Sequence, residues 1–166
     1  MPETPVRIGE LVATNDPDEV LVSVGLGSCI GLAMIDRPRG IVGLAHVMLP
    51  ESPNGAGPLR GRYANHAVPI LLEEVLALGA RPSGLEIGLA GGAQMFAKTS
   101  SIEVGRRNEE AVRLALSAAS LSVKATATGG DRGRTVRVHA QGGVMTSREV
   151  AGDEIVLLGK PVGVLA

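Results

Sequence analysis

The stretch of residues 20–50 constrains this chain more than any other, because it combines two apolar runs, a turn and the one cysteine of the chain. The runs 30–35 and 40–47 have the length and the β-branched content of strands. The segment Asp-Arg-Pro-Arg at 36–39 separates them and is typical of a turn. The pattern predicts an antiparallel β-hairpin.

The register of this hairpin makes a geometric prediction. A four-residue loop would pair Ile35 with Gly40 and, at the open end, Cys29 with His46. Directly opposed residues point to one face with Cβ atoms about 4.5–5.5 Å apart, whereas a shift by one residue would separate the faces. The sequence therefore predicts a thiol beside an imidazole.

A thiol and an imidazole in contact are the core of a nucleophilic site. The imidazole removes the thiol proton, and a third group holds the imidazole in one tautomer. Ser23 is the candidate third residue, as an acceptor for the ring N–H of His46, and the backbone amides of Gly27 and Ser28 are candidate donors to an oxyanion. Equally, Cys29 can be a small buried hydrophobe and His46 a structural residue.

The same residues, with four further blocks, resemble the CheD family of chemoreceptor glutamine deamidases. The blocks follow one another along nearly the whole chain: Gly-Leu-Gly-Ser-Cys at 25–29, Ala-His-Val-Met-Leu-Pro at 45–50, Gly-Arg-Tyr-Ala-Asn at 61–65, Gly-Gly-Ala-Gln-Met-Phe at 91–96, Gly-Arg-Arg-Asn at 105–108 and Gly-Gly-Asp-Arg-Gly-Arg at 129–134. The first two blocks are specific together, whereas the glycine blocks are weak individually.

The resemblance implies a cytoplasmic cysteine hydrolase, without a cofactor, that converts receptor glutamine side chains to glutamate and releases ammonia. Its nucleophile falls on Cys29, its base on His46, and its third residue, usually threonine, on Ser23. The implied partners are the cytoplasmic domain of a methyl-accepting receptor and a CheC-type phosphatase, and binding to that phosphatase alone is the non-enzymatic alternative. The implied fold is a layered α/β sandwich related to deamidating toxins.

The remaining sequence predicts one α+β domain over residues 1–166, with mixed, mainly antiparallel sheets and two main helices. The helices are expected at 67–78, with Pro69 in the first turn, and at 108–120. Strands are expected within 6–13, at 85–90, 123–128, 135–140 and 143–147, and from 155 through 164, with hairpin turns at 129–133 and 141–143.

Four polar residues at element boundaries are candidate substrate contacts, namely Arg62, Tyr63, Asn65 and Gln141. Asn65 can equally be a helix cap. The segment 92–99 is a near match to a phosphate-binding loop with Lys98, but alanine replaces its second glycine and β-branched residues follow it, which argues against nucleotide binding.

Composition excludes several other classes of function. A net charge of −1 does not suit a nucleic-acid-binding protein, and one tyrosine and one phenylalanine offer little surface for base stacking. One cysteine rules out an internal disulfide, suits a reducing cytoplasm and makes a zinc site improbable. We expect no membrane insertion, because no apolar run has the length of a bilayer span.

Overall fold

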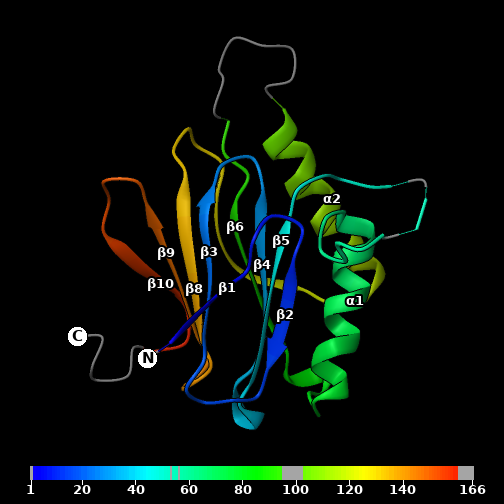
Figure 1. The fold of residues 1–166 in the computed structure, drawn as a ribbon, viewed down its shortest axis with the longest axis vertical. Helices are drawn as coiled ribbons and strands as arrows, with labels where there is room; N and C mark the ends of the chain where they lie inside the picture. Colours follow the sequence, from blue (N-terminus) through cyan, green and yellow to red (C-terminus); the bar gives the residue numbers. More distant parts are fainter. Residues whose placement is uncertain (1, 53, 56, 95–102, 161–166) are drawn as a thin grey trace.

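The computed structural model describes residues 2–52, 54–55, 57–94 and 103–160. It contains two helices, two short 3-10 turns and ten strands (Figure 1). In chain order these are β1 (Glu3–Pro5), β2 (Leu11–Thr14), β3 (Val20–Leu26), β4 (Ile30–Asp36), η1 (Arg37–Arg39), β5 (Ile41–Val47), α1 (Ala64–Ala77), η2 (Pro82–Gly84), β6 (Glu86–Gly91), α2 (Val104–Ala118), β7 (Val123–Thr128), β8 (Arg134–His139), β9 (Val144–Glu149) and β10 (Glu154–Leu158).

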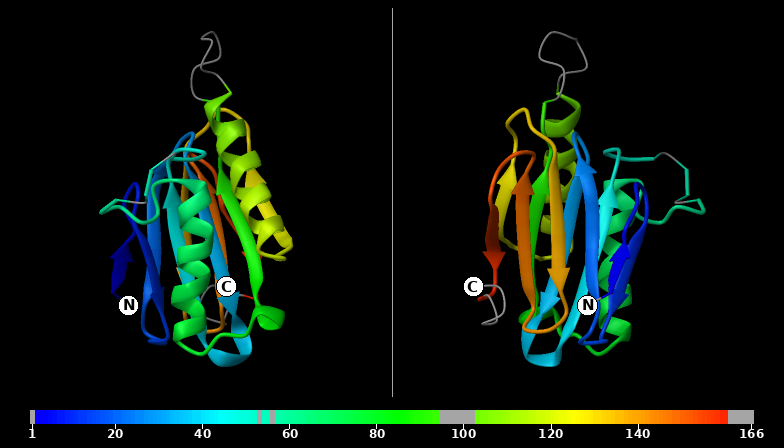
Figure 2. Two further views of the ribbon diagram at one scale, coloured as in Figure 1. Left: turned by 90° about the vertical axis from the view of Figure 1, so that its right-hand side faces the viewer. Right: turned by 60° about the vertical axis from the view of Figure 1, so that its left-hand side comes forward.

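The elements form three layers, as the two views of Figure 2 show. Sheet 1 has the strand order β1-β3-β8-β9-β10, and sheet 2 has the order β2-β5-β4-β6-β7. Both sheets are mixed, since β1 pairs with β3 and β6 with β7 in parallel and the other pairs are antiparallel. Both helices pack on sheet 2. The predicted α+β layered architecture is confirmed.

The central strand β4 is apolar along its length because both of its faces are buried. Leu32 and Met34 belong to the core between sheet 2 and the helices, whereas Ala33 and Ile35 belong to the core between the two sheets. Successive side chains of a strand point to opposite faces, and both faces of β4 are covered. The continuous apolar run is therefore the signature of the middle layer.

Strands β4 and β5 form the predicted hairpin, but the predicted register is wrong by two residues. Ile35 pairs with Val42 rather than with Gly40, because Asp36 continues β4. The turn is the 3-10 segment η1, and Gly40 follows it with a φ of 67° that suits glycine.

The observed register pairs His46 with Gly31, so Cys29 and His46 are not directly opposed. Cys29 lies two residues before Gly31, just outside β4. Since an even shift keeps each side chain on its face, Cys29 and His46 still share one face of sheet 2 and become diagonal neighbours.

The strand predicted within 6–13 is confirmed only at its end, in β2, whereas residues 6–10 are not a strand and β1 precedes them in the other sheet. β1 pairs with β3 in sheet 1, and β2 pairs with β5 in sheet 2. Gly9, with a φ of 83°, lies in the connection between them. The chain therefore crosses between the sheets at residues 6–10.

Both helices begin earlier than the sequence predicts. Pro69 lies inside α1 rather than in its first turn, because α1 begins at Ala64. Helix α2 begins at Val104, so Asn108, the predicted first residue, is a buried residue of the second turn. No helix among the described residues is long and apolar enough to cross a membrane.

The C-terminal strands agree with prediction in position but not in every connection. β8 and β9 form a hairpin around residues 140–143. Residues 129–133 are not a hairpin turn, because they connect β7 of sheet 2 to β8 of sheet 1. The last strand, β10, pairs with β9. The expected continuation to residue 164 lies outside the described residues from 161 onward.

Candidate active site

His46 is buried between the two sheets and is oriented by a backbone carbonyl. It lies on β5 with 2% of its surface exposed, and its Nδ1 is 3.1 Å from the Val6 carbonyl oxygen. A carbonyl oxygen can only accept, so Nδ1 carries the proton and Nε2 is the basic nitrogen. Burial lowers the pKa of His46, and the hydrogen bond to Val6 opposes this shift.

Ser23 reaches the same oxygen from the opposite sheet. Its Oγ donates a hydrogen bond of 2.9 Å to the Val6 carbonyl, and the residue is fully buried on β3. The predicted hydrogen bond from His46 to the Ser23 hydroxyl is therefore wrong. Both side chains donate to Val6, at the point where the chain crosses between the sheets, and Val6 itself is tied to β3 by a hydrogen bond from its N–H to the Val22 carbonyl.

Cys29 lies in the segment between β3 and β4, at the upper end of the sheets in Figure 1, and packs against the core between the sheets. It is partly exposed, and burial raises the pKa of its thiol. His46 Nε2 is buried and has no hydrogen-bond partner among the described residues. Burial thus favours the neutral thiol and the neutral imidazole, and the two groups share one face of sheet 2 without a thiol–imidazole hydrogen bond.

The segment of residues 27–29, here called the nucleophile loop because it holds the candidate nucleophile Cys29, has carbonyls that accept hydrogen bonds from the residues after β6. The Gly27 carbonyl accepts from Ala93 N–H and the Cys29 carbonyl from Gly92 N–H, each at 2.9 Å. The backbone N–H groups of residues 27–29 make no backbone hydrogen bond to another described residue outside the strands. Backbone amides beside an attacking thiol can stabilise an oxyanion.

Asn108 is a residue of this site that reasoning on the sequence did not identify. It is fully buried on α2, and its Nδ2 donates to the carbonyls of Ser28 and Met48, each at 2.9 Å. The two acceptors belong to the nucleophile loop and to the end of the segment that carries His46. The available signal was the Gly-Arg-Arg-Asn block at 105–108, in which the acidic residues after Asn108 indicate the start of a helix rather than a buried side chain.

Arg62 and Tyr63 lie beside the end of β5. The Arg62 carbonyl accepts from the amides of Met48 and Leu49 at 2.9 and 3.0 Å, and its guanidinium lies 5.3 Å from the centre of the Tyr63 ring. Arg62 Nε is buried without a partner among the described residues. Both residues therefore lie near the site, although among the described residues neither side chain makes a hydrogen bond to Cys29 or His46.

Asn65 and Gln141 have other surroundings. The Asn65 carboxamide is 3.2 Å and 3.4 Å from the backbone N and O of Ser52 and ties the loop after β5 to helix α1, whose N-cap is Tyr63. Gln141 follows the end of β8, where His139 pairs with Val20 at the beginning of β3, whereas Cys29 follows the end of β3. The structure therefore places Gln141 at the opposite end of sheet 1 from Cys29.

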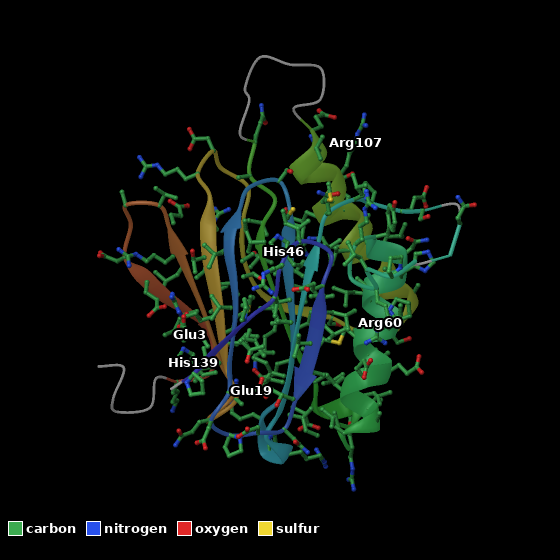
Figure 3. All side chains as sticks on the ribbon, viewed as in Figure 1. Glu3, Glu19, His46, Arg60, Arg107 and His139 are labelled. Atoms are coloured by element: carbon green, nitrogen blue, oxygen red, sulfur yellow. The ribbon has the colours of Figure 1, made fainter. Side chains whose placement is uncertain are left out.

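The other histidines and the remaining motif do not join the site. His139 lies toward the lower end of the molecule, away from His46 (Figure 3). Among the described residues, no group of three His, Cys, Asp or Glu side chains could hold a metal ion. Lys98 and Thr99 of the near match to a phosphate-binding loop lie outside the described residues.

Comparison with known proteins identifies the relatives of this arrangement. The family model described as "CheD chemotactic sensory transduction" matches residues 48–149. A probable chemoreceptor glutamine deamidase CheD of Methanococcus vannielii is 41% identical over 90% of this chain and 96% of its own length. The chemoreceptor glutamine deamidase CheD of Thermotoga maritima is 39% identical over 90% of this chain and 93% of its own length.

Proposed function

This chain belongs to the CheD family, and we propose that it is a chemoreceptor glutamine deamidase of bacterial or archaeal chemotaxis in which Cys29 is the nucleophile and His46 the base. The observation that carries the proposal is the orientation of His46. Its Nδ1 is held by the Val6 carbonyl, so its Nε2, which is buried and has no hydrogen-bond partner in the described part of the chain, is the basic nitrogen on the face that it shares with Cys29.

The first half of the reaction forms a thioester. The Cys29 Sγ attacks the side-chain amide carbon of a substrate glutamine while its proton passes to His46 Nε2. The C–N bond then breaks, and His46 returns the proton to the departing ammonia. The chain in its resting form holds a thiol with a raised pKa and an imidazole with a lowered pKa, which supports proton transfer during attack over a preformed thiolate.

The second half hydrolyses the thioester. A water molecule gives a proton to His46 Nε2 and adds to the carbonyl carbon, after which the C–S bond breaks and Cys29 recovers its proton. In both halves the negative oxygen is stabilised by backbone N–H groups of the nucleophile loop. No step requires a metal or an organic cofactor.

Ser23 acts in this proposal through Val6 rather than through His46. Two donors on one carbonyl oxygen, at 2.9 and 3.1 Å, restrict its position and therefore the plane of the imidazole. Arg62 and Tyr63 are the proposed walls for the substrate segment, because they flank the end of β5. The substrate is the cytoplasmic domain of a methyl-accepting receptor.

The deciding experiment compares the wild type with Cys29→Ala on such a receptor domain. Ammonia release and tryptic mass mapping should show conversion of glutamine to glutamate by the wild type only. His46→Gln should also lose turnover while it still binds the receptor. If neither the wild type nor Cys29→Ala converts glutamine but both bind a CheC-type phosphatase, the chain is a regulatory binding partner and the deamidase proposal fails.

A further inference from the structure

We propose that Asn108 is a positioning residue that sets the distance between Cys29 and His46, and this inference rests on the deamidase function proposed above. The two reacting groups are diagonal rather than opposed, so the ladder of β4 and β5 alone does not fix their separation. Cys29 lies before β4 begins, and Met48 lies after β5 ends. An additional tie between these two extensions is therefore needed.

The side chain of Asn108 is that tie. Both hydrogens of its Nδ2 are used, one on the Ser28 carbonyl and one on the Met48 carbonyl, each at 2.9 Å. Ser28 precedes the nucleophile, and Met48 follows His46 by two residues. The contacts are shielded from water because Asn108 is fully buried. One nitrogen atom thus links the nucleophile loop to the segment of the base.

The helix that carries Asn108 packs through Gly105 on residues 92 and 93, the segment that holds the nucleophile loop. A Cβ at Gly105 would lie 2.5 Å from the Gly92 carbonyl oxygen and 2.7 Å from that of Ala93, so no side chain fits there. The amides of Gly92 and Ala93 in turn hold the carbonyls of Cys29 and Gly27. All three carbonyls of the nucleophile loop are therefore held by α2, directly or through the segment on which it packs.

The unpartnered oxygen of Asn108 argues against a purely stabilising role. Oδ1 is buried without a hydrogen-bond partner among the described residues, and a buried unsatisfied oxygen costs free energy. A leucine of similar size would avoid that cost and would fill the same space. The asparagine amide is therefore explained by its two donors, which position the groups proposed to react.

The test uses Asn108→Leu and Asn108→Asp, read by turnover and by alkylation of the thiol. Cys29 is the one cysteine of the chain, so iodoacetamide reports on it alone. We expect kcat for receptor deamidation to fall by about 10- to 100-fold, since misplacement of reacting groups by about 1 Å has effects of that size. KM should change little. Alkylation at pH 7 should instead become several-fold faster, because the released loop exposes the thiol.

Val112→Ala is the matched control, because Val112 lies one turn further along the buried face of α2 and contacts the helix-side core. It should lower the melting temperature without changing kcat or the alkylation rate. The proposal is overturned if folded Asn108→Leu retains wild-type kcat, or if Val112→Ala reproduces both effects. If the wild type has no deamidase activity, the deamidase proposal fails, whereas the alkylation rates of the same variants still test the tie.

Discussion

Ser23 and His46 lie on different sheets and donate hydrogen bonds to the same atom, the carbonyl oxygen of Val6. The distances are 2.9 Å from Ser23 Oγ and 3.1 Å from His46 Nδ1. Val6 is placed there by the crossing of the chain between β1 and β2. The orientation of the His46 ring therefore depends on a backbone group near the N-terminus, and Ser23 donates to that same group.

Removal of the Ser23 hydroxyl should slow the reaction without abolishing it. In Ser23→Ala the Val6 carbonyl keeps His46 as a donor but loses the second hydrogen bond, whose net contribution to stability is about 0.5–1.5 kcal/mol. We expect kcat to fall by roughly 3- to 10-fold, in proportion to such an energy. Ser23→Thr keeps the donor and should retain turnover. Wild-type kcat in Ser23→Ala would remove Ser23 from the mechanism.

The rate of the reaction should depend on pH through the fraction of His46 that is in its neutral form. Burial lowers the pKa of His46, so the working form persists to lower pH than for an ordinary histidine. Activity is present above this lowered pKa and is lost as the pH falls through it, and the acid limb of kcat/KM should have its midpoint below about 6.5.

The thiol of the resting protein should titrate at high pH. Burial raises the pKa of Cys29, so the rate of alkylation by iodoacetamide should rise with a midpoint above the ordinary value of about 8.5. A midpoint near pH 6 or below would mean a preformed thiolate–imidazolium pair and would contradict the proton transfer proposed here. The measurement needs no substrate and uses the wild-type protein.

Gly61 should tolerate no side chain, because of its contact with the segment that crosses between the sheets. A Cβ there would lie 2.5 Å from the Glu10 carbonyl oxygen, which accepts the His46 amide at 2.9 Å. Gly61→Ala should lower the free energy of unfolding by about 1–3 kcal/mol and reduce turnover as well. Gly55→Ala is the control, since a Cβ at Gly55 has no neighbour within 4 Å. Equal melting temperatures for the two variants would contradict the argument.

The sequence was sufficient to predict the hairpin and the face that Cys29 and His46 share, but not the register of the two strands. The polar segment 36–39 predicts that Asp36 belongs to the turn. It is instead fully buried at the end of β4, where its carboxylate accepts hydrogen bonds from the Arg81 amide at 2.9 Å and from the Arg39 side chain. A distant partner such as Arg81 leaves no local signal, so propensity alone places the strand end too early.

The carbonyl shared by Ser23 and His46 could not be predicted for a different reason. The alternation of residues 6–13 indicates a strand but does not show that the chain changes sheets within it. The change of sheet depends on which strands accept the backbone hydrogen bonds of this segment. The Val6 N–H donates to the Val22 carbonyl in sheet 1, whereas the Gly9 N–H donates to the His46 carbonyl in sheet 2. Pairing over long distances in sequence is a property of the assembled sandwich.

Lysine should not be able to replace Arg134, because the guanidinium holds together the strand ends next to the nucleophile loop. Its Nη1 donates to the carbonyls of Gly91 and Gly129 at 3.1 and 2.9 Å, and its Nη2 donates to Glu149 at 3.1 Å. A lysine cannot reproduce this fork of donors, so buried carbonyls would lose their partners. Arg134→Lys should lower the free energy of unfolding by about 1–3 kcal/mol in denaturant titrations.

The matched control for Arg134 is Arg132→Lys, which makes the same change at an exposed position two residues earlier. It should change the free energy of unfolding by less than about 0.5 kcal/mol. Because Gly91 adjoins Gly92, whose amide holds the Cys29 carbonyl, Arg134→Lys should also alter the alkylation rate of Cys29, whereas Arg132→Lys should not. If both variants unfold at the denaturant concentration of the wild type, the three hydrogen bonds of Arg134 do not support this end of the sandwich.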